Sequence, residues 1–138
     1  MDTILGIPIP FTWPERIACI SALITVLFAA LCLLVAPRFS LKLLRLQTLP
    51  DVPGAVSEAR GTMAGFYLGA GLLPLLLQQP LLFMVLGAGW AFTALGRLVS
   101  MLADHKPFAG FNTFNVGSIL FEAALALAAF LPLLFPAF

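Results

Sequence analysis

Residues 61–96 have the sequence GTMAGFYLGAGLLPLLLQQPLLFMVLGAGWAFTALG, which carries the strongest fold signal of the chain. It contains two long apolar segments without a charged residue, separated only by Gln78, Gln79 and Pro80. About 20 apolar residues in an α-helix are enough to cross the hydrocarbon core of a bilayer. Because the link is so short, the sequence predicts two antiparallel transmembrane helices, over about residues 57–78 and 80–103.

Two further apolar segments flank this hairpin, at about residues 16–36 and 113–135. The first begins near Pro14 and ends before Pro37, and proline favours the first turn of a helix but not its interior. It lacks a small-residue cleavage site, so we expect a retained helix rather than a signal peptide. The chain is therefore predicted to be a single all-α domain, residues 1–138, with four transmembrane helices in a bundle.

The composition agrees with a membrane protein. Of the 138 residues, 62% are hydrophobic and 9% are charged, and the mean hydropathy is +1.09. A soluble domain has about 25% charged residues, because its surface must face water. The net charge of +1 provides no field that attracts nucleic acid, so we expect the lipid bilayer as partner. The single histidine, His105, leaves no basis for a haem or zinc site, and no metal or cofactor is predicted.

Basic residues cluster in the connection between the first two helices. Arg38, Lys42 and Arg45 recur at spacings of four and three, so on a helix they share one face. We predict a short interfacial helix there, with its bases toward lipid headgroups; a plain connector whose bases only set the topology is the alternative. Lys106 adds a base to the third connection, whereas the second has none. Counting positive charges therefore places both termini on the side away from the cytoplasm.

Small residues predict where the helices pack. The second segment contains Gly61, Gly65 and Gly69 at intervals of four, which form a groove that another helix backbone can approach closely. Gly87 and Gly89 lie in the third segment. We expect the two sets of glycines to meet within the hairpin, and a homodimer seam is the alternative.

Ionisable residues inside the predicted helices are candidates for a functional site. Glu122 lies about 13 Å into the last helix, where a charge costs several kcal/mol unless it is paired, and Arg97 has a comparable depth in the preceding helix. We predict that these side chains meet, directly or through one polar bridge, with Ser118 one turn from Glu122. Glu58 and Arg60, at the mouth of the second helix, are placed to extend this network. A structural clamp and a proton, ion or ligand site both remain open.

Catalytic motifs are absent from the chain. It has no phosphate-binding glycine loop, no H-E-x-x-H pattern and no G-x-S-x-G pattern, so no catalytic residue is predicted. The leading hypothesis is a non-enzymatic membrane protein, either an accessory or structural subunit of a larger membrane complex or a bundle that binds a lipophilic ligand. The alternative is a small homo-oligomeric transporter in which Glu122 is the coupling carboxylate. A membrane enzyme acting on lipophilic substrates is a third hypothesis, for which the sequence shows no nucleophile–base pair.

Several of these residues also resemble those of a known family. Over about residues 31–134 the chain is similar to the domain-of-unknown-function 4345 family, small bacterial four-helix membrane proteins. The features that carry the similarity are Pro37, Glu58-Ala59-Arg60-Gly61, Gly65, Gly69, Gly96-Arg97-Leu98, Asp104 and Glu122. The chain departs from the family pattern at Ala64 and Lys106, where glycine is common. The resemblance implies a location in the bacterial inner membrane and supplies no activity.

Overall fold

The computed structural model describes residues 3–4, 7–8, 12–48, 52, 54, 56–104 and 111–135. The described elements are helical apart from a short antiparallel strand pair near the N-terminus, which was not predicted from the sequence. In chain order the elements are β1 (Thr3–Ile4), β2 (Ile7–Pro8), α1 (Trp13–Leu27), the π-helical segment η1 (Phe28–Val35), α2 (Pro37–Leu43), α3 (Val56–Glu58), the π-helical segment η3 (Ala59–Met63), α4 (Ala64–Leu77), α5 (Pro80–Ala103) and α6 (Thr113–Leu134).

Helices α1 and α6 begin at residues that cap them. The backbone N–H of Thr12 donates to Oε2 of Glu15 at 3.0 Å, as in a capping box. At α6, Oδ1 of Asn112 accepts a hydrogen bond from the backbone N–H of Asn115 at 3.0 Å. Both caps satisfy backbone N–H groups that have no partner within the helix. The local sequence therefore accounts for where these two helices start.

In the part of the chain that the structure describes, three helices are long and apolar enough to cross a membrane: Trp13–Val35, which combines α1 and η1, then α5 and α6. Their outward faces carry large apolar side chains, among them Phe92 at 70% exposure and Leu120 at 66%. A soluble monomer rarely exposes so much contiguous apolar surface, whereas lipid covers it without cost.

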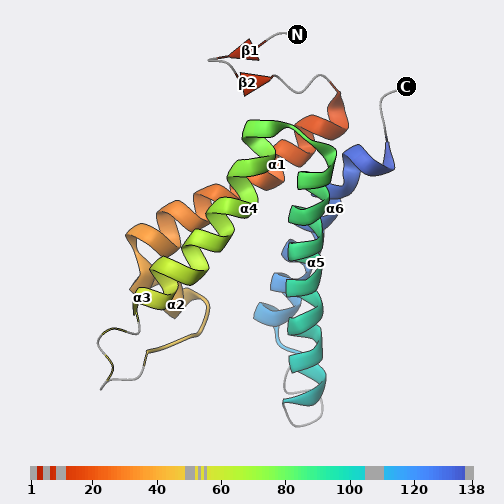
Figure 1. The fold of residues 1–138 in the computed structure, drawn as a ribbon. Helices are drawn as coiled ribbons and strands as arrows, with labels where there is room; N and C mark the ends of the chain where they lie inside the picture. The colour runs from red at the N-terminus through yellow and green to blue at the C-terminus, as the bar shows by residue number, and fades with distance from the viewer. Residues whose placement is uncertain are drawn as a thin grey trace.

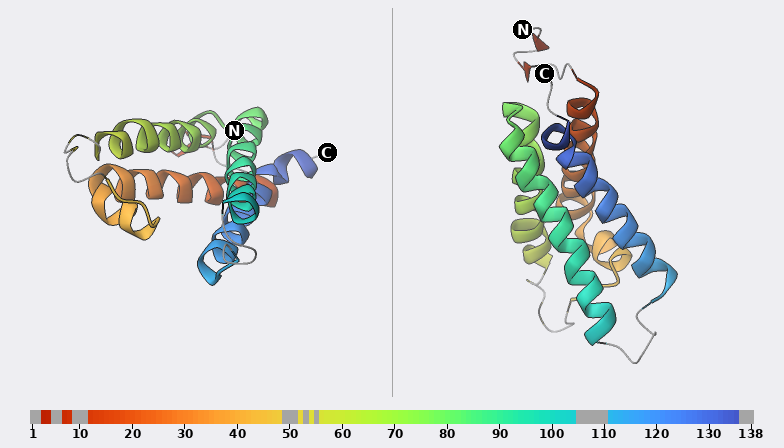
Figure 2. Two further views of the ribbon diagram at one scale, coloured as in Figure 1. Left: turned by 90° about the horizontal axis from the view of Figure 1, so that it is seen from below. Right: turned by 90° about the vertical axis from the view of Figure 1, so that its right-hand side faces the viewer.

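The helices form two pairs that converge at one end of the molecule and diverge toward the other (Figures 1 and 2). Helix α1 packs on α4, α5 packs on α6, and α1 also contacts α6. We call these the α1–α4 pair and the α5–α6 pair. Gln78 and Gln79 join α4 to α5, and the left-handed backbone of Gln78 (φ 50°) ends α4. The two helices are antiparallel, as the short link predicts, but they diverge away from the link.

The hydrophobic core lies at the convergent end. Phe83, Leu86 and Trp90 of α5 are buried there against small residues of α1 and against α6. In a membrane the hydrophobic effect does not drive helices together, so close packing of small residues contributes much of the free energy of helix association. The remaining core residues are Ala18, Ala22, Leu125, Ala126 and Ala129.

The described residues of the second and third segments do not form the predicted glycine groove. Because α4 packs on α1 rather than along α5, the α4 face with Gly65 is exposed. The prediction of an intramolecular seam is therefore wrong at most of its positions, and the homodimer alternative stays a prediction. A Cβ added at four of the predicted glycines meets no atom within 4 Å; these are Gly61, Gly65, Gly69 and Gly89.

Among the described glycines, close helix contact occurs at Gly71, which was not among the predicted positions, and at Gly87, which was. A Cβ added at Gly71 would lie 2.8 Å from Cγ2 of Val26 and 2.9 Å from the carbonyl oxygen of Ala22, both in α1. A Cβ added at Gly87 would lie 3.1 Å from the ring of Phe130 in α6. Gly87 is thus a packing glycine, as predicted, but its neighbour is α6 rather than α4.

Candidate functional site

Arg97 of α5 and Glu122 of α6 form an ion pair between the two helices. Nη2 of Arg97 donates to Oε1 of Glu122 at 2.6 Å, and Nε lies 3.2 Å from Oε1 and 3.3 Å from Oε2. The Glu122 side chain is only 6% exposed, and that of Arg97 is 24% exposed. Contacts through both Nε and Nη2 fix the guanidinium relative to the carboxylate, a geometry that lysine cannot reproduce. The two side chains meet directly, without a bridging group.

The helical spacing explains why both side chains point inward. Glu122 shares the buried face of α6 with Leu125 and Ala129. Ser118, one turn before Glu122, is half-buried on the same side. On α5, Thr93 and Arg97 are also one turn apart. The two helices therefore present a polar group of four residues to the gap between the helix pairs, and we call Thr93, Arg97, Ser118 and Glu122 the polar cluster.

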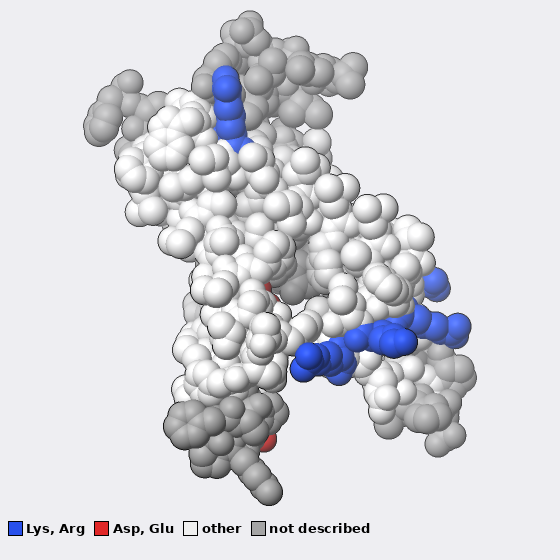
Figure 3. Space-filling view, turned by 180° about the vertical axis from the view of Figure 1, so that it is seen from behind, with Lys and Arg blue, Asp and Glu red and all other residues white. Residues whose placement is uncertain are grey.

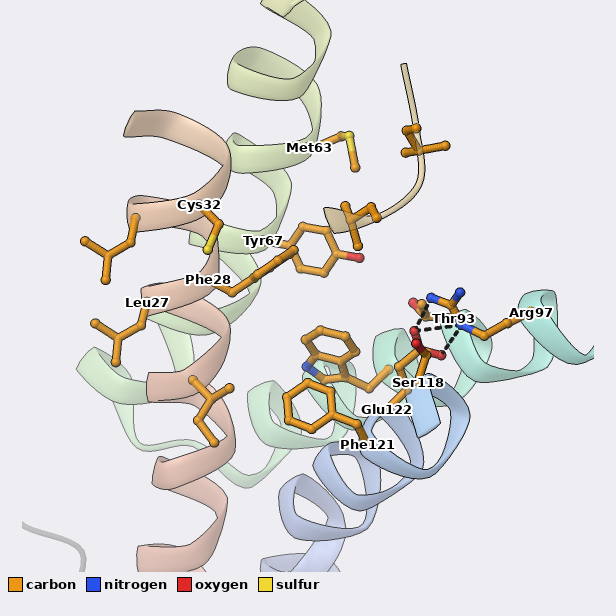
Figure 4. A pocket seen from close by; sticks show the side chains of 15 residues that line it. Leu27, Phe28, Cys32, Met63, Tyr67, Thr93, Arg97, Ser118, Phe121 and Glu122 are labelled. Carbon is orange, nitrogen blue, oxygen red and sulfur yellow. Dashed lines mark hydrogen bonds and ion pairs between the residues drawn. The ribbon is translucent and has the colours of Figure 1, made fainter. Parts of the chain in front are cut away.

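A cavity of about 650 Å³ lies beside the polar cluster, between the two helix pairs. The α1–α4 pair contributes a mainly apolar wall, and Leu44 and Leu46, which follow α2, line one side. Tyr67 reaches into the cavity from α4, and its hydroxyl points toward the polar cluster (Figure 4). The cavity is thus apolar over most of its wall and polar at one end.

Four aromatic side chains connect the two helix pairs along the cavity. The ring centroids of Phe28 and Tyr67 are 5.7 Å apart, those of Tyr67 and Trp90 5.5 Å, and those of Trp90 and Phe121 6.4 Å. Each separation suits an attractive ring contact. All four residues line the cavity, and we call them the aromatic wall.

Trp90 is held in place by hydrogen bonds that join α5, α1 and α6. Nε1 of Trp90 donates to the Thr25 hydroxyl at 2.9 Å, and that hydroxyl donates to the carbonyl of Ser21 at 2.9 Å. The Ser21 hydroxyl donates to the carbonyl of Leu125 at 2.9 Å. These residues were not predicted from the sequence, although Ser21 and Thr25 lie one turn apart in an otherwise apolar segment.

Glu58 and Arg60 do not join the ion pair. Nε of Arg60 donates to the carbonyl of Leu34 at 3.2 Å, and Glu58 accepts a hydrogen bond from the Thr62 hydroxyl at 2.8 Å. Both residues are exposed at the divergent end, where the α1–α4 pair has moved away from α5 and α6. The predicted extension of the network is wrong, because it assumed that the second and third helices stay side by side.

Basic side chains gather at the divergent end of the α1–α4 pair, next to the hollow between the pairs (Figure 3). Arg38 and Lys42 are exposed on α2, as predicted for one helical face. Arg45 departs from that prediction, because α2 ends at Leu43 and Arg45 has a left-handed backbone (φ 59°). Its guanidinium carbon lies 4.2 Å from the ring centre of Phe114 in α6. This cation–π contact joins the segment after α2 to the opposite helix pair.

Comparison with known protein families gives a match over most of the chain. The family model described as a domain of unknown function (DUF4345) matches residues 14–133, a range that includes the ion pair and the residues lining the cavity. No curated protein matches the chain, and no solved structure matches it. Since the family model covers most of the sequence, the chain belongs to the domain-of-unknown-function 4345 family.

Proposed function

We propose that this protein is a four-span protein of the bacterial inner membrane that binds a lipophilic molecule and catalyses no reaction. The observation that carries the proposal is the cavity between the helix pairs, with its apolar wall and its single polar end. Ligand sites in proteins have volumes of about 300–1,000 Å³ and place a few polar groups in a mostly apolar wall. The cavity has both properties.

The fourth span in this proposal is residues 56–77, where α3, η3 and α4 follow one another without a break. A helix rises about 1.5 Å per residue, so this run has about the length of the hydrocarbon core. Its charged residues, Glu58 and Arg60, lie in its first turns. Beyond them, Phe66 is 76% exposed and Leu76 is 49% exposed, as expected for side chains that face lipid.

The basic cluster supports an orientation with the divergent end in the cytoplasm. Arg38 and Lys42 of α2 and Arg60 lie at that end, whereas α1 begins and α6 ends at the convergent end (Figure 1). Both termini would then be periplasmic. On α2, Phe39 and Leu43 are also exposed, so a position in the interface suits both its charges and its apolar side chains. Lys106, which also entered the charge count, lies outside the described residues.

A reporter that fluoresces only in the cytoplasm tests this orientation. Fused after Phe138, it is expected to be dark, because the end of α6 faces the periplasm. Inserted at Pro53, it is expected to be bright. Bright fluorescence from the first fusion and none from the second would invert the orientation without altering the number of spans.

Filling the cavity tests ligand binding. Ser118→Phe places a ring in the space beside Glu122, and Leu120→Phe places the same ring on the lipid-facing side of the same helix. Native mass spectrometry of gently solubilised protein is expected to show a bound lipophile on the wild type and on Leu120→Phe. The bound fraction is expected to fall at least about ten-fold in Ser118→Phe, because the aromatic ring occupies the volume of the ligand.

The same spectra distinguish the other roles. Wild-type protein that has no small molecule bound and is detected in a complex with other proteins would contradict ligand binding and favour the role of an accessory subunit. Equal occupancy in both phenylalanine variants would place the bound molecule on the outer surface rather than in the cavity.

Burial of Glu122 beside the cavity supports one second candidate, a homo-oligomeric transporter in which this carboxylate is the coupling group. Its pairing with Arg97 favours a structural role, since both charges are used in the contact. A transporter requires that Glu122→Gln keep the fold and lose pH-dependent transport in vesicles.

A further inference from the structure

We infer that the ligand of the cavity is an uncharged lipophile whose head is a planar ring bearing a hydrogen-bond acceptor, such as a carbonyl oxygen. This inference rests on the proposed function and specifies its ligand class. It follows from three properties of the cavity wall: its charge balance, its spare hydrogen-bond donors and its aromatic surface.

The charges on the wall cancel. Among the described residues that line the cavity, Arg97 and Glu122 are the only ionised side chains, and they neutralise each other at 2.6 Å. A ligand carboxylate or ammonium group would compete with one member of the pair and leave the other charge unpaired in an apolar environment. The site therefore disfavours anionic and cationic head groups.

The hydrogen-bond donors of Arg97 that remain free favour a ligand with a hydrogen-bond acceptor. Arg97 uses Nε and Nη2 to bind Glu122, and among the described residues Nη1 has no hydrogen-bond acceptor. The Tyr67 hydroxyl lies at the same end of the cavity (Figure 4), but it already forms a hydrogen bond with Thr93, so the free donors are those of Arg97. Arginine has five N–H donors and no acceptor, so a ligand that binds its free N–H groups must provide an acceptor such as oxygen. A neutral carbonyl oxygen satisfies this requirement without adding charge.

The aromatic wall favours a planar ring. Tyr67, Trp90 and Phe121 present neighbouring ring surfaces along the cavity beside the polar cluster. A flat ring on these surfaces gains the favourable geometry of aromatic contacts, which a saturated chain lacks. The apolar tail then has an exit to lipid, because Leu27 and Leu31 line the cavity and are 47% and 60% exposed.

Tryptophan fluorescence provides the test, because the chain has two tryptophans and only Trp90 lines the cavity. In a Trp13→Phe background, reconstituted in phosphatidylcholine nanodiscs, a benzoquinone with a decyl tail is expected to quench Trp90 saturably. Decylbenzene, decylcyclohexane and decanoate are added as competitors. Their dissociation constants, measured by displacement of the quinone, are expected to be at least about ten-fold larger than that of the quinone itself. Decylbenzene lacks the acceptor, decylcyclohexane lacks the planar ring, and decanoate is charged.

Two conservative variants test the donors. Arg97→Lys keeps the charge but replaces the planar guanidinium, so the Nη1 donors are lost from their position. Tyr67→Phe keeps the ring and removes a hydroxyl that already forms a hydrogen bond with Thr93, so it is the control. Arg97→Lys is expected to weaken binding of the quinone by about five- to ten-fold, the effect of one lost hydrogen bond, whereas Tyr67→Phe is expected to change it by no more than about two-fold. The affinity of decylbenzene, measured by displacement, is expected to stay within about two-fold. Equal weakening of both probes would show that the variants distort the cavity, and would overturn the role of the donors.

The outcomes separate this inference from the proposed function. If decanoate or decylcyclohexane displaces the quinone with a dissociation constant close to that of the quinone itself, the cavity binds lipophiles but the inferred class is wrong. If quenching never saturates and Ser118→Phe leaves it unchanged, no ligand occupies the cavity, and the proposed function fails as well.

Discussion

Replacing either member of the Arg97–Glu122 pair by glutamine is expected to lower the free energy of unfolding by about 3–5 kcal/mol. Each change leaves the other charge buried between α5 and α6 without its partner. Arg97→Gln is expected to cost more, because Glu122 is short and 6% exposed, whereas an unpaired Arg97 can extend toward the interface. Unfolding by titration with denaturing detergent in mixed micelles measures both values.

The double variant tests whether the pair acts as a unit. Arg97→Gln with Glu122→Gln removes both charges, so it is expected to recover part of the loss, and its effect is expected to be smaller than the sum of the single effects. Arg60→Gln and Glu58→Gln are matched controls, since they make the same chemical changes at exposed positions. Each control is expected to change stability by no more than about 0.5 kcal/mol.

Additive single effects would show that Arg97 and Glu122 do not stabilise the fold together. A fully stable Glu122→Gln variant that has lost pH-dependent transport would reject the clamp and favour the transporter. The measurement therefore decides between the two roles that the residue positions alone leave open.

Gly71→Leu is expected to be the most disruptive single change on α4. Even one added carbon at Gly71 would lie 2.8 Å from Cγ2 of Val26 and 2.9 Å from the carbonyl oxygen of Ala22. Because one of these contacts is with the backbone of α1, rotation of a side chain cannot relieve it, and the two helices must separate. We expect a loss of about 1–3 kcal/mol for Gly71→Ala and more for Gly71→Leu.

Gly65 provides the control on the same helix. A Cβ added there meets no atom within 4 Å, so Gly65→Ala is expected to be neutral or to stabilise by up to about 1 kcal/mol through helix propensity. Gly65→Leu is also expected to be tolerated, although the four-residue glycine repeat predicts a clash. Thermal unfolding in one detergent compares all four variants. Equal losses at both positions would mean that α4 is rotated relative to the arrangement described above or forms an interface with a second copy.

Much of the helical architecture can be deduced from local sequence. Three of the described helices are long and apolar enough to cross a bilayer, Pro37 separates α1 with η1 from α2, and the link at Gln78 and Gln79 requires α4 and α5 to be antiparallel. These conclusions depend on length, on hydrogen bonding within each segment and on the geometry of a short turn. None of them depends on which helices are neighbours in the folded protein.

The ion pair is a second feature that the residues alone predict well. Glu122 cannot reach water from the middle of a span, so it requires a partner, and Arg97 is the base at a matching depth in the preceding helix. The same reasoning failed at Glu58 and Arg60. Those side chains are exposed at the end of their helix, where Glu58 bonds to Thr62 and Arg60 bonds to the carbonyl of Leu34 in η1, so no buried charge determines where that end must be.

Helix neighbours and inward faces are determined by contacts between segments distant in the chain. Gly71 and Gly87 meet other helices whereas Gly65 and Gly89 do not, although all four lie in similarly apolar surroundings. The divergence of the two helix pairs, and with it the cavity, likewise follows from α1 packing against both α4 and α6. In a soluble protein, the outer face of each helix carries polar residues because it contacts water. Lipid is as apolar as the protein core, so an outward leucine and an inward leucine give the same local pattern, and only packing between the helices distinguishes them.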